Sequence, residues 1–346
     1  MPVITQARMR EIDEQILLAM HCPPDTAQLV ADVLVTADIK GVDSHGSRLL
    51  AMYQRNVAAG HIIPTARPDI IRQDGAVTLL DGHWCFGHVG ARLAAAHAIA
   101  SAKAYGIGAA TLVNCLHIGR VGDYSEKVAE AGMLGIVMCN ANRATTPLGG
   151  MERMLGTNPI ALAAPRQDGQ MLSVDFATSA KSINKMQLYR QRGKPLPEDV
   201  ILDKNGYPTT DPNDFFAGGI LLPVGGYKGY ALNLFIDIIG GVLIGAGPGA
   251  MIDKSIHPGN GTLVLALDIS RWRSTGDFEE RLDTLLGIVK GVPLAPGYDE
   301  ILLPGELEVR AETERRRTGI PFDDETWNEI KGVAQKVGAP ESLFEA

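Results

Sequence analysis

The chain has 346 residues, 45% of them hydrophobic, with 39 glycines and a formal net charge of −8. A single hydrophobic core seldom serves a chain of this length, so we expect two or three lobes. The apolar and glycine content favours a globular α/β protein over a disordered one. The charges are mixed and form no basic stripe, which argues against nucleic acid as the main partner.

Cysteine spacing and hydropathy suggest a cytoplasmic protein. The N-terminus is polar and lacks the apolar core of a signal peptide. The most apolar stretch, residues 231–246, contains Asn233, Asp237 and several glycines, so we interpret it as a buried helix rather than a membrane span. The cysteines form no CxxC pair, which predicts neither a zinc site nor a disulfide framework. They are Cys22, Cys85, Cys115 and Cys139.

Residues 1–68 are predicted to form an N-terminal helical lobe. Apolar residues at helical spacing predict two or three amphipathic helices between Thr5 and Ala59, broken at residues 23–24 by two prolines. One of these helices should end near Gly41. Ser44 is then placed to cap a second helix that starts near Gly46.

Residues 69–268 alternate strands with helices, which predicts an α/β layer. A basic helix over 181–192 is interpreted as a solvated face, with a cofactor-facing role as the alternative. Residues 193–219 are predicted to form a long irregular excursion, compatible with a lid or a dimer arm. Residues 269–346 form a C-terminal helical segment expected to pack on the N-terminal lobe. The expected strands are 76–80, 108–114, 134–140, 160–164, 172–176 and 261–268, and the further expected helices are 90–104, 122–131, 277–289, a helix ending near 317, and 324–337.

Two histidines are candidates for proton exchange, because an imidazole titrates near neutral pH. His45 lies in Asp43-Ser44-His45-Gly46, between two predicted helices, where Asp43 is close enough to orient the ring. His117 lies at a strand end before Gly119, where ligands of open α/β layers gather. A capped turn and an ordinary loop histidine are the structural alternatives for the two sites.

Three arginines are candidates for binding a substrate carboxylate through two parallel hydrogen bonds. Arg48 lies near His45 in the sequence, and Arg55 and Arg120 are the other two. A surface salt bridge is the alternative for each. The spacing of histidines and carboxylates predicts no metal site, and no GxSxG elbow is present for a serine nucleophile.

No GxGxxG fingerprint follows an early strand, so we do not expect a standard Rossmann site. The near match at residues 245–250 follows a predicted helix and carries a proline. The best candidate for a phosphate is the stretch 225–229, whose glycines expose backbone N–H groups beside Lys228 at a helix start. A plain glycine turn with a surface lysine is the alternative. The strand end at 175–179 offers one carboxylate and two hydroxyls for a ribose or a nicotinamide amide, unless the hydroxyls are helix caps.

Together these segments resemble, in order and spacing, the malate/L-lactate dehydrogenase family of the second type, which is unrelated to the Rossmann lactate dehydrogenases. The resemblance covers essentially the whole chain and looks closest to the hydroxycarboxylate dehydrogenase B branch. Ureidoglycolate, sulfolactate and diketogulonate enzymes are relatives in this family. The segments are Asp43-Ser44-His45-Gly46, His117-Ile118-Gly119, Gly156-Thr157-Asn158-Pro159, Asp175-Phe176-Ala177-Thr178-Ser179, Gly226-Tyr227-Lys228-Gly229-Tyr230 and Leu303-Pro304-Gly305-Glu306.

The resemblance implies a homodimeric oxidoreductase that uses NAD or NADP to interconvert a 2-hydroxy acid and its 2-oxo acid. It implies a mixed α/β sheet of the family's own kind, with a helical lobe built from the two chain ends. His45 would be the proton donor and acceptor, with His117 close to the substrate, although in some members the histidine that matches His117 has the proton role. The implied cofactor contacts are Asn142, Asp175, Phe176, Ala177, Thr178, Tyr227, Lys228, Gly305 and Glu306.

One departure from the family pattern leaves the substrate open. Many members place an arginine four residues after the histidine of this motif, where this chain has Leu49, with Arg48 one step earlier. The substrate is therefore expected to be a small 2-hydroxy acid or, alternatively, a cyclic imine or a sugar keto acid. The residues also allow a Schiff-base enzyme that uses Lys228, or a non-enzymatic module that binds an organic acid or a nucleotide. No residue spacing assigns the choice between NAD and NADP.

Overall fold

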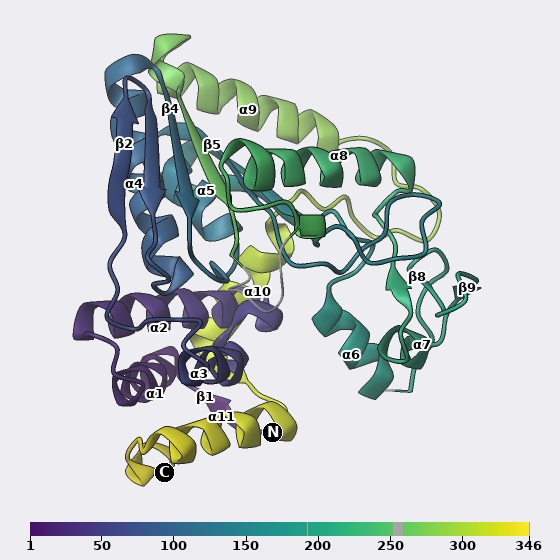
Figure 1. Ribbon diagram of the computed structural model, residues 1–346. Helices are drawn as coiled ribbons and strands as arrows, with labels where there is room; N and C mark the ends of the chain where they lie inside the picture. Colours follow the sequence, from purple (N-terminus) through teal and green to yellow (C-terminus); the bar gives the residue numbers. More distant parts are fainter. Residues whose placement is uncertain (192, 252–258, 346) are drawn as a thin grey trace.

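The computed structural model describes residues 1–191, 193–251 and 259–345 (Figure 1). Within them, a seven-stranded sheet has the order β2-β3-β4-β11-β5-β6-β7. Only β3 and β4 run parallel in it, and every other neighbouring pair is antiparallel, so the sheet is mixed. The strands are β2 (Asp69–Asp74), β3 (Val77–Asp81), β4 (Ile107–Val113), β5 (Met133–Cys139), β6 (Pro159–Pro165), β7 (Met171–Ala177) and β11 (Thr262–Asp268).

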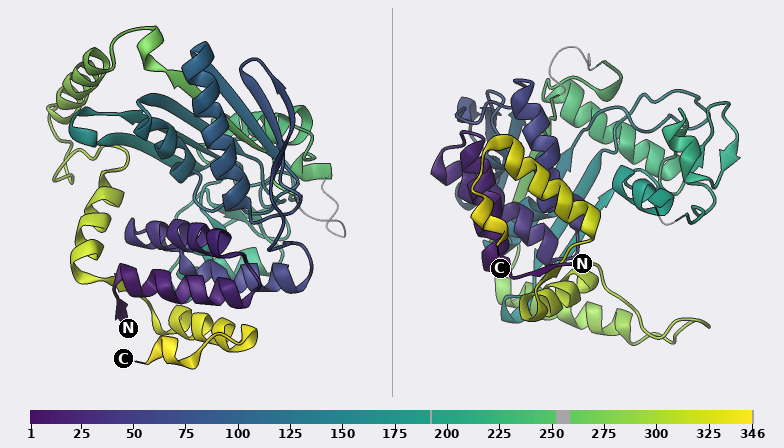
Figure 2. Two further views of the ribbon diagram at one scale, coloured as in Figure 1. Left: turned by 90° about the vertical axis from the view of Figure 1, so that its left-hand side faces the viewer. Right: turned by 90° about the horizontal axis from the view of Figure 1, so that it is seen from below.

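Helices α4 (Gly87–Tyr105) and α5 (Gly122–Glu130) pack on one face of this sheet, and α8 (Tyr227–Asp237) lies on the other side (Figures 1 and 2). The close approach of α4 depends on glycine in β4. A Cβ at Gly108 would lie 1.9 Å from the carbonyl oxygen of Ala98. Burial alternates along β4 and β5, because one face of each strand meets these helices.

A helical layer lies below the sheet and combines both ends of the chain (Figure 1). One hydrophobic core contains Ile16, Leu34, Tyr53 and Ile330, each at most 1% exposed. Short strands β1 (Val3–Ile4) and β12 (Ile320–Pro321) pair, and the N-terminal amine of Met1 lies 3.0 Å from Asp324 Oδ1, so the first residues of the chain pack beside its C-terminal segment. The helices of this layer are α1 (Gln6–Ala19), α2 (Pro24–Ile39), α3 (Leu50–Ala58), α10 (Glu306–Thr318) and α11 (Asp324–Val337).

A small lobe occupies much of the stretch that the sequence predicted to be irregular (Figure 1). Its core includes Met186, Ile201, Phe215 and Leu221, all buried. Its strands are two residues long, which is too short to leave a period in the sequence. The predicted end of its first helix, at residue 192, lies outside the described residues. The lobe consists of α6 (Ile183–Gln191), β8 (Ile201–Leu202), β9 (Pro208–Thr209), α7 (Pro212–Phe216) and β10 (Ile220–Leu221).

Two predictions about individual elements were wrong, and one strand was missed. No helix begins at Gly46: two 3-10 turns, Asp43–His45 and Ser47–Leu49, precede α3, which has no side-chain cap among the described residues. Strand β2 was missed because all six of its residues are exposed, so it shows no alternation. The apolar stretch after Tyr230 is helical but not buried, since Phe235 in α8 is 64% exposed and Leu243, in the π-helix that follows, is 75% exposed.

The remaining predicted helices are confirmed with small shifts at their ends, and α11 has the predicted bounds. The helix that follows β11 is α9 (Thr275–Lys290). Among the described helices, none has the length and apolar character needed to cross a membrane. The four cysteines are buried free thiols.

Candidate active site

The turn that carries His45 is anchored to two buried carboxyl groups. Ser47 donates its backbone N–H and its hydroxyl to Asp38 Oδ2, at 2.9 and 2.6 Å, and its Oγ lies 2.7 Å from Asp13 Oδ2. Gly46 leaves room for this contact, because a Cβ there would lie 1.6 Å from Asp38 Oδ1. Burial raises the pKa of Asp38 to about 7 and the pKa of Asp13 well above its usual value.

The imidazole of His45 is held by Ser44 and stacks on His117. Ser44 Oγ lies 2.9 Å from His45 Nδ1, and the centroids of the two imidazole rings are 5.5 Å apart with planes 18° from parallel. Asp43, which we expected to orient the ring, instead forms an ion pair with Arg315 of α10. The sequence did not reveal this because the arginine is 272 residues away.

Both histidines are neutral near pH 7 in this environment. Burial, with a further contribution from the charge of Arg120, lowers the pKa of His45 to about 4. Burial and the neighbouring histidines hold the pKa of His117 well below its usual value. The Nε2 atoms of both rings make no hydrogen bond within the described residues and are not among the buried unpaired atoms. They are therefore open to a ligand.

Arg120 is occupied by a buried cluster of carboxylates. Its guanidinium lies 2.7 Å from Asp123, 2.5 Å from Glu126 and 3.6 Å from Asp175, and only 3% of its side chain is exposed. Lys40 adds a second cation, 2.5 Å from Glu126. These contacts leave Arg120 unsuited to bind a substrate carboxylate.

Two further arginines were candidates for that role. Arg48 is half-buried, in the turn directly after Gly46, and forms no hydrogen bond or ion pair in the described part of the chain. Arg55 is exposed on α3. Arg48 is thus the better-placed of the two, since it lies in the turn that follows His45.

The end of β7 adjoins both the Arg120 cluster and the start of α10. Asp175 Oδ2 accepts a 2.8 Å hydrogen bond from the backbone N–H of Gly122, and burial raises the pKa of Asp175 to about 6 against the opposing charge of Arg120. Gly305, with φ of +88°, lies against Ser173, whose carbonyl oxygen would be 3.1 Å from a Cβ at Gly305. The structure thus brings two of the predicted cofactor segments together.

Some of the predicted cofactor contacts have structural partners instead. Thr178 is buried and its hydroxyl lies 3.0 and 2.9 Å from the carbonyl oxygens of Thr157 and Asn158. Glu306 lies 2.5 Å from Lys290 and accepts the N–H of Leu303 at 3.0 Å. Next to Asp175, Phe176 is 41% exposed and Ala177 is half-buried. Asp175 is therefore the member of its segment with a carboxylate oxygen still available.

The glycine loop before α8 has the features of an anion site. Gly225 and Gly226 have φ of +60° and +63°, and no described atom lies within 4 Å of a Cβ at either position. Within the described ranges the helix start has no side-chain cap, and Tyr227 and Lys228 are exposed there, with Lys228 Nζ 6.0 Å from the Tyr227 ring. Among the described residues Lys228 has no ion pair. Free N–H groups, open backbone and a cation fit the phosphates of a dinucleotide.

Backbone contacts connect this loop to the neighbouring segments. The N–H of Val224 donates to the carbonyl of Thr178 at 2.9 Å, which joins the loop to the end of β7. Asn142 is exposed beside Ala141, whose N–H donates to Asn158 Oδ1 at 2.9 Å. Asn158 in turn binds Asn233 of α8 at 2.9 Å. The loop that carries Asn142 is therefore anchored to α8.

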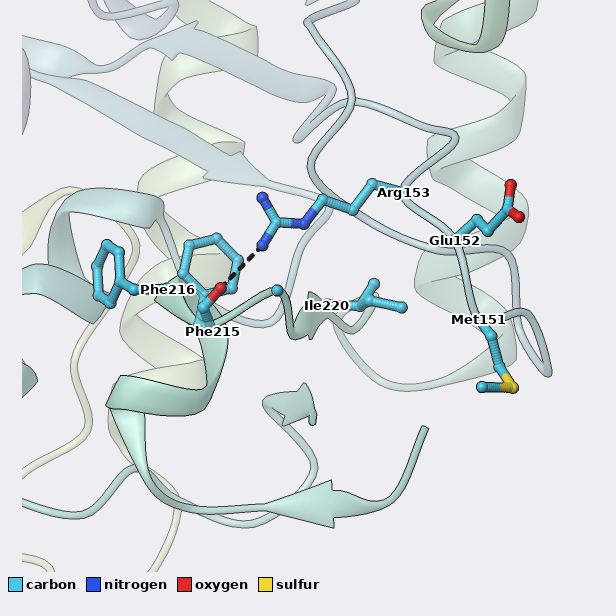
Figure 3. Close-up of a pocket in the computed structure, with 7 residues that line it drawn as sticks. Met151, Glu152, Arg153, Phe215, Phe216 and Ile220 are labelled. Carbon is cyan, nitrogen blue, oxygen red and sulfur yellow. Dashed lines mark hydrogen bonds between the residues drawn. The ribbon is translucent and has the colours of Figure 1, made fainter. Parts of the chain in front are cut away.

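One described cavity lies elsewhere. Its volume is about 440 Å³, and it is lined by residues of the small lobe and of the 151–153 loop. Figure 3 shows Arg153 directed at the Phe215 carbonyl, which accepts its hydrogen bond at 2.9 Å, and the guanidinium also stacks over the Phe215 ring. None of the predicted site residues lines it. No cluster of ligating side chains suited to a metal ion occurs among the described residues.

Two residues of the histidine cluster were not found from the sequence. Tyr53 and His88 are both 0% exposed, and Tyr53 touches His117 and His88. Tyr53 falls on the apolar stripe of α3, so its sequence position predicts a core residue and nothing more.

Comparison with known proteins agrees with the predicted resemblance. A model of the malate/L-lactate dehydrogenase family matches residues 4–331. L-Sulfolactate dehydrogenase of Methanothermobacter thermautotrophicus is 35% identical over 331 residues, covering 94% of this chain and 95% of the relative. Hydroxycarboxylate dehydrogenase B of Escherichia coli K12 is 34% identical over 350 residues, covering 96% and 94%.

The fold agrees as well. The crystal structure of malate dehydrogenase from Entamoeba histolytica matches with a TM-score of 0.94 at 29% identity, covering 98% of this chain and 99% of that one. Both the sequence match and the structural match extend over nearly the whole length, which confirms the mixed α/β fold implied by the six segments. The chain therefore belongs to the malate/L-lactate dehydrogenase family of oxidoreductases.

Proposed function

We propose that the protein interconverts a small 2-hydroxy acid and its 2-oxo acid, with NAD or NADP as the hydride carrier. The stacked pair of neutral imidazoles, His45 and His117, carries this proposal, because both present an open Nε2 atom. Arg48, three residues after His45 in the chain, has no partner among the described residues. Such a pair of imidazoles can bind and deprotonate one hydroxyl group. The dehydrogenase names of the relatives support the same class of reaction.

The proton is exchanged at His45. With its Nδ1–H donated to Ser44 Oγ, Nε2 carries the lone pair that accepts the 2-hydroxyl proton during oxidation and returns it during reduction. Arg48 binds the carboxylate, and its position in the turn after Gly46 ties that contact to the placement of His45. When bound, the nicotinamide ring supplies or accepts the hydride.

The cofactor would lie along the segments around the ends of β7 and α8. The residues suited to hold it are the N–H groups of the glycine loop and Lys228 for phosphate, and Asp175 for a ribose hydroxyl. Asn142, Tyr227 and the turn at Gly305 border the same region. The raised pKa of Asp175 makes this contact sensitive to pH, because protonation replaces one acceptor oxygen of the carboxylate with an O–H donor.

The first test follows NADH and NADPH oxidation against a panel of 2-oxo acids, a cyclic imine carboxylate and a sugar keto acid. We expect turnover with a small 2-oxo acid. Replacing His45 by alanine should lower kcat by about 10²- to 10⁴-fold while the cofactor Kd stays unchanged. His21→Ala, at a histidine in the turn after α1, is the control. Full turnover in the His45 variant would contradict the assignment, and turnover confined to the imine or the sugar acid would move the proposal to those substrates.

A Schiff base at Lys228 gains no support from the structure. An amine nucleophile of this kind is usually activated by an apolar pocket or a neighbouring cation, and Lys228 is exposed at a helix start. Borohydride trapping with the active keto acid should leave no adduct on the protein.

We also propose that the protein pairs with a second copy of itself. Phe235 of α8 and Val242 of the following π-helix are both 64% exposed, and Ile238 between them is 41% exposed. Ile238 follows Phe235 by three residues, and Val242 follows Ile238 by four. The three side chains therefore lie on one face of the continuous helix. Monomers rarely expose a contiguous apolar surface of this kind. Because α8 begins at the glycine loop, pairing along it would place the partner next to the cofactor region.

A further inference from the structure

Tyr53 connects two histidines in the core beneath the site. Its Oη lies 2.9 Å from His117 Nδ1 and 3.3 Å from His88 Nε2. A phenol carries one proton, so it can donate to only one of these nitrogens and must accept a hydrogen bond from the other. The direction of the two hydrogen bonds therefore fixes the tautomers of both histidines.

The contact of Gly119 with His117 determines the direction of the two Tyr53 hydrogen bonds. Its backbone N–H donates to His117 Nδ1 at 3.3 Å, which requires a lone pair on that nitrogen. The neutral ring of His117 must then carry its proton on Nε2. It follows that Tyr53 donates its proton to His117 Nδ1 and accepts a hydrogen bond from the Nε2–H of His88.

The packing around His88 agrees with this assignment. His88 Nδ1 is buried without a partner in the described part of the chain, which suits a lone pair better than an orphan N–H donor. Burial lowers the pKa of His88 to about 3 and raises the pKa of Tyr53 above its usual value, so both groups stay neutral at ordinary pH. A Cβ at Gly119 would lie 2.7 Å from His88 Nε2, so glycine is needed to bring the three groups together.

We propose that Tyr53 and His88 are positioning residues that hold His117 as its Nε2–H tautomer. His117 then presents a hydrogen-bond donor to the 2-oxygen of the substrate, and His45 alone exchanges the proton. The two stacked histidines thus have different roles, which depend on the hydrogen-bond partner of each Nδ1 atom. Nδ1 of His45 contacts Ser44, and Nδ1 of His117 contacts Tyr53 and Gly119. The substrate contact rests on the proposed function, whereas the tautomer does not.

Nitrogen-15 NMR of histidine-labelled protein without ligands tests the tautomer directly. The His117 signals are assigned by their loss in His117→Gln. At pH 7 we expect a protonated Nε2 and a bare Nδ1. In Tyr53→Phe the Nδ1 lone pair keeps only the long bond from Gly119, so the His117 signals should shift to values averaged over both tautomers. Tyr124→Phe is the matched control, since Tyr124 is equally buried and its hydroxyl donates to the Ile118 carbonyl instead.

Kinetics with the active substrate test the consequence. Tyr53→Phe should lower kcat by about 10- to 100-fold, the usual cost of losing an orienting partner, and leave the cofactor KM unchanged. His88→Gln keeps an N–H donor near the position of Nε2 and should retain most of the activity, whereas His88→Leu should match Tyr53→Phe. A structural role alone would make the two His88 variants equal.

The outcomes separate this inference from the proposed function. A wild-type His117 with its proton on Nδ1, or an unchanged His117 signal in Tyr53→Phe, would overturn the inference even in an active enzyme. An Nε2–H tautomer that is lost in Tyr53→Phe supports it. If such a protein turned over no substrate of the panel, the proposed function would fail and the positioning of His117 would stand.

Discussion

At the residue scale, the environment of His45 determines whether its imidazole accepts or donates a proton in the free site. A pKa of about 4, set by burial and by the charge of Arg120, leaves the imidazole neutral and basic at neutral pH. The free site is therefore prepared to accept a proton during oxidation. For reduction, the ring must first be protonated, which a negatively charged substrate favours by its Coulomb attraction.

This environment predicts the pH profile. We expect kcat/KM for the 2-hydroxy acid, measured at saturating cofactor, to stay level from pH 8 to 5 and to fall as the pH approaches about 4, since protonation removes the base. Circular dichroism over the same range checks that the protein stays folded. A break near the ordinary histidine pKa of about 6.5 would show that His45 is less desolvated than the structure indicates.

At the element scale, the turn between α2 and α3 depends on Gly46. A methyl group there would lie 1.6 Å from Asp38 Oδ1, so Gly46→Ala must displace the carboxyl that binds Ser47. We expect a loss of about 1–3 kcal/mol in the free energy of unfolding, the usual cost of overpacking, together with a lower kcat. Gly332→Ala in α11 meets no described atom within 4 Å and should be neutral or stabilising. Equal effects in urea unfolding of the two variants would contradict this account.

The buried carboxyl group of Asp38 also predicts how the free energy of unfolding depends on pH. The folded-state pKa of Asp38, about 7, is higher than the unfolded value of about 3.9, so the folded protein holds a proton that the unfolded chain has released. That contribution to stability is lost as the pH rises from about 4 through 7. Asp38→Asn mimics the protonated form and does not titrate. The unfolding free energy of this variant minus that of the wild type should therefore increase from pH 5 to pH 8. Asp32→Asn, at an exposed carboxylate of the same helix, is the control. A constant difference between Asp38→Asn and the wild type across this range would refute the assignment.

At the scale of the whole molecule, the exposed apolar face of α8 and the π-helix that follows it predicts the oligomeric state. Light scattering should give about twice the chain mass of 37.0 kDa. Phe235→Glu combined with Val242→Glu should shift the mass to that of the monomer, because each places a charge in the apolar contact. Tyr105→Glu, at an exposed residue ending α4, should leave it unchanged. A monomeric wild type at micromolar concentration would exclude the homodimer.

The family and most elements could be predicted from the sequence because their signals are local. Strand β4 is a short run without charged residues, predicted at 108–114 and found at Ile107–Val113, and α11 begins after a capping Asp323 and ends before Gly338, so the bounds of each are visible in the sequence to within a residue. Six short segments in order were enough to indicate the family and both histidines of the site. Two elements were not predicted correctly. Strand β2 has no buried face, so its residues do not alternate between apolar and polar. Apolar residues of α8 lie on an exposed face, and their spacing is the same as that of a buried face.

Only the tertiary structure decided which groups meet. Arg120 lies beside three carboxylates, Asp43 turns to an arginine at the other end of the chain, and Asp38 fills the space left by Gly46. These contacts depend on how α2, α5, β7 and α10 pack, and side chains distant in sequence leave no joint pattern along it. The sequence by itself determined most of the secondary structure and the chemical groups available; packing decided which of those groups are buried, paired or free to react, because desolvation and hydrogen bonding exist only once the elements are in contact.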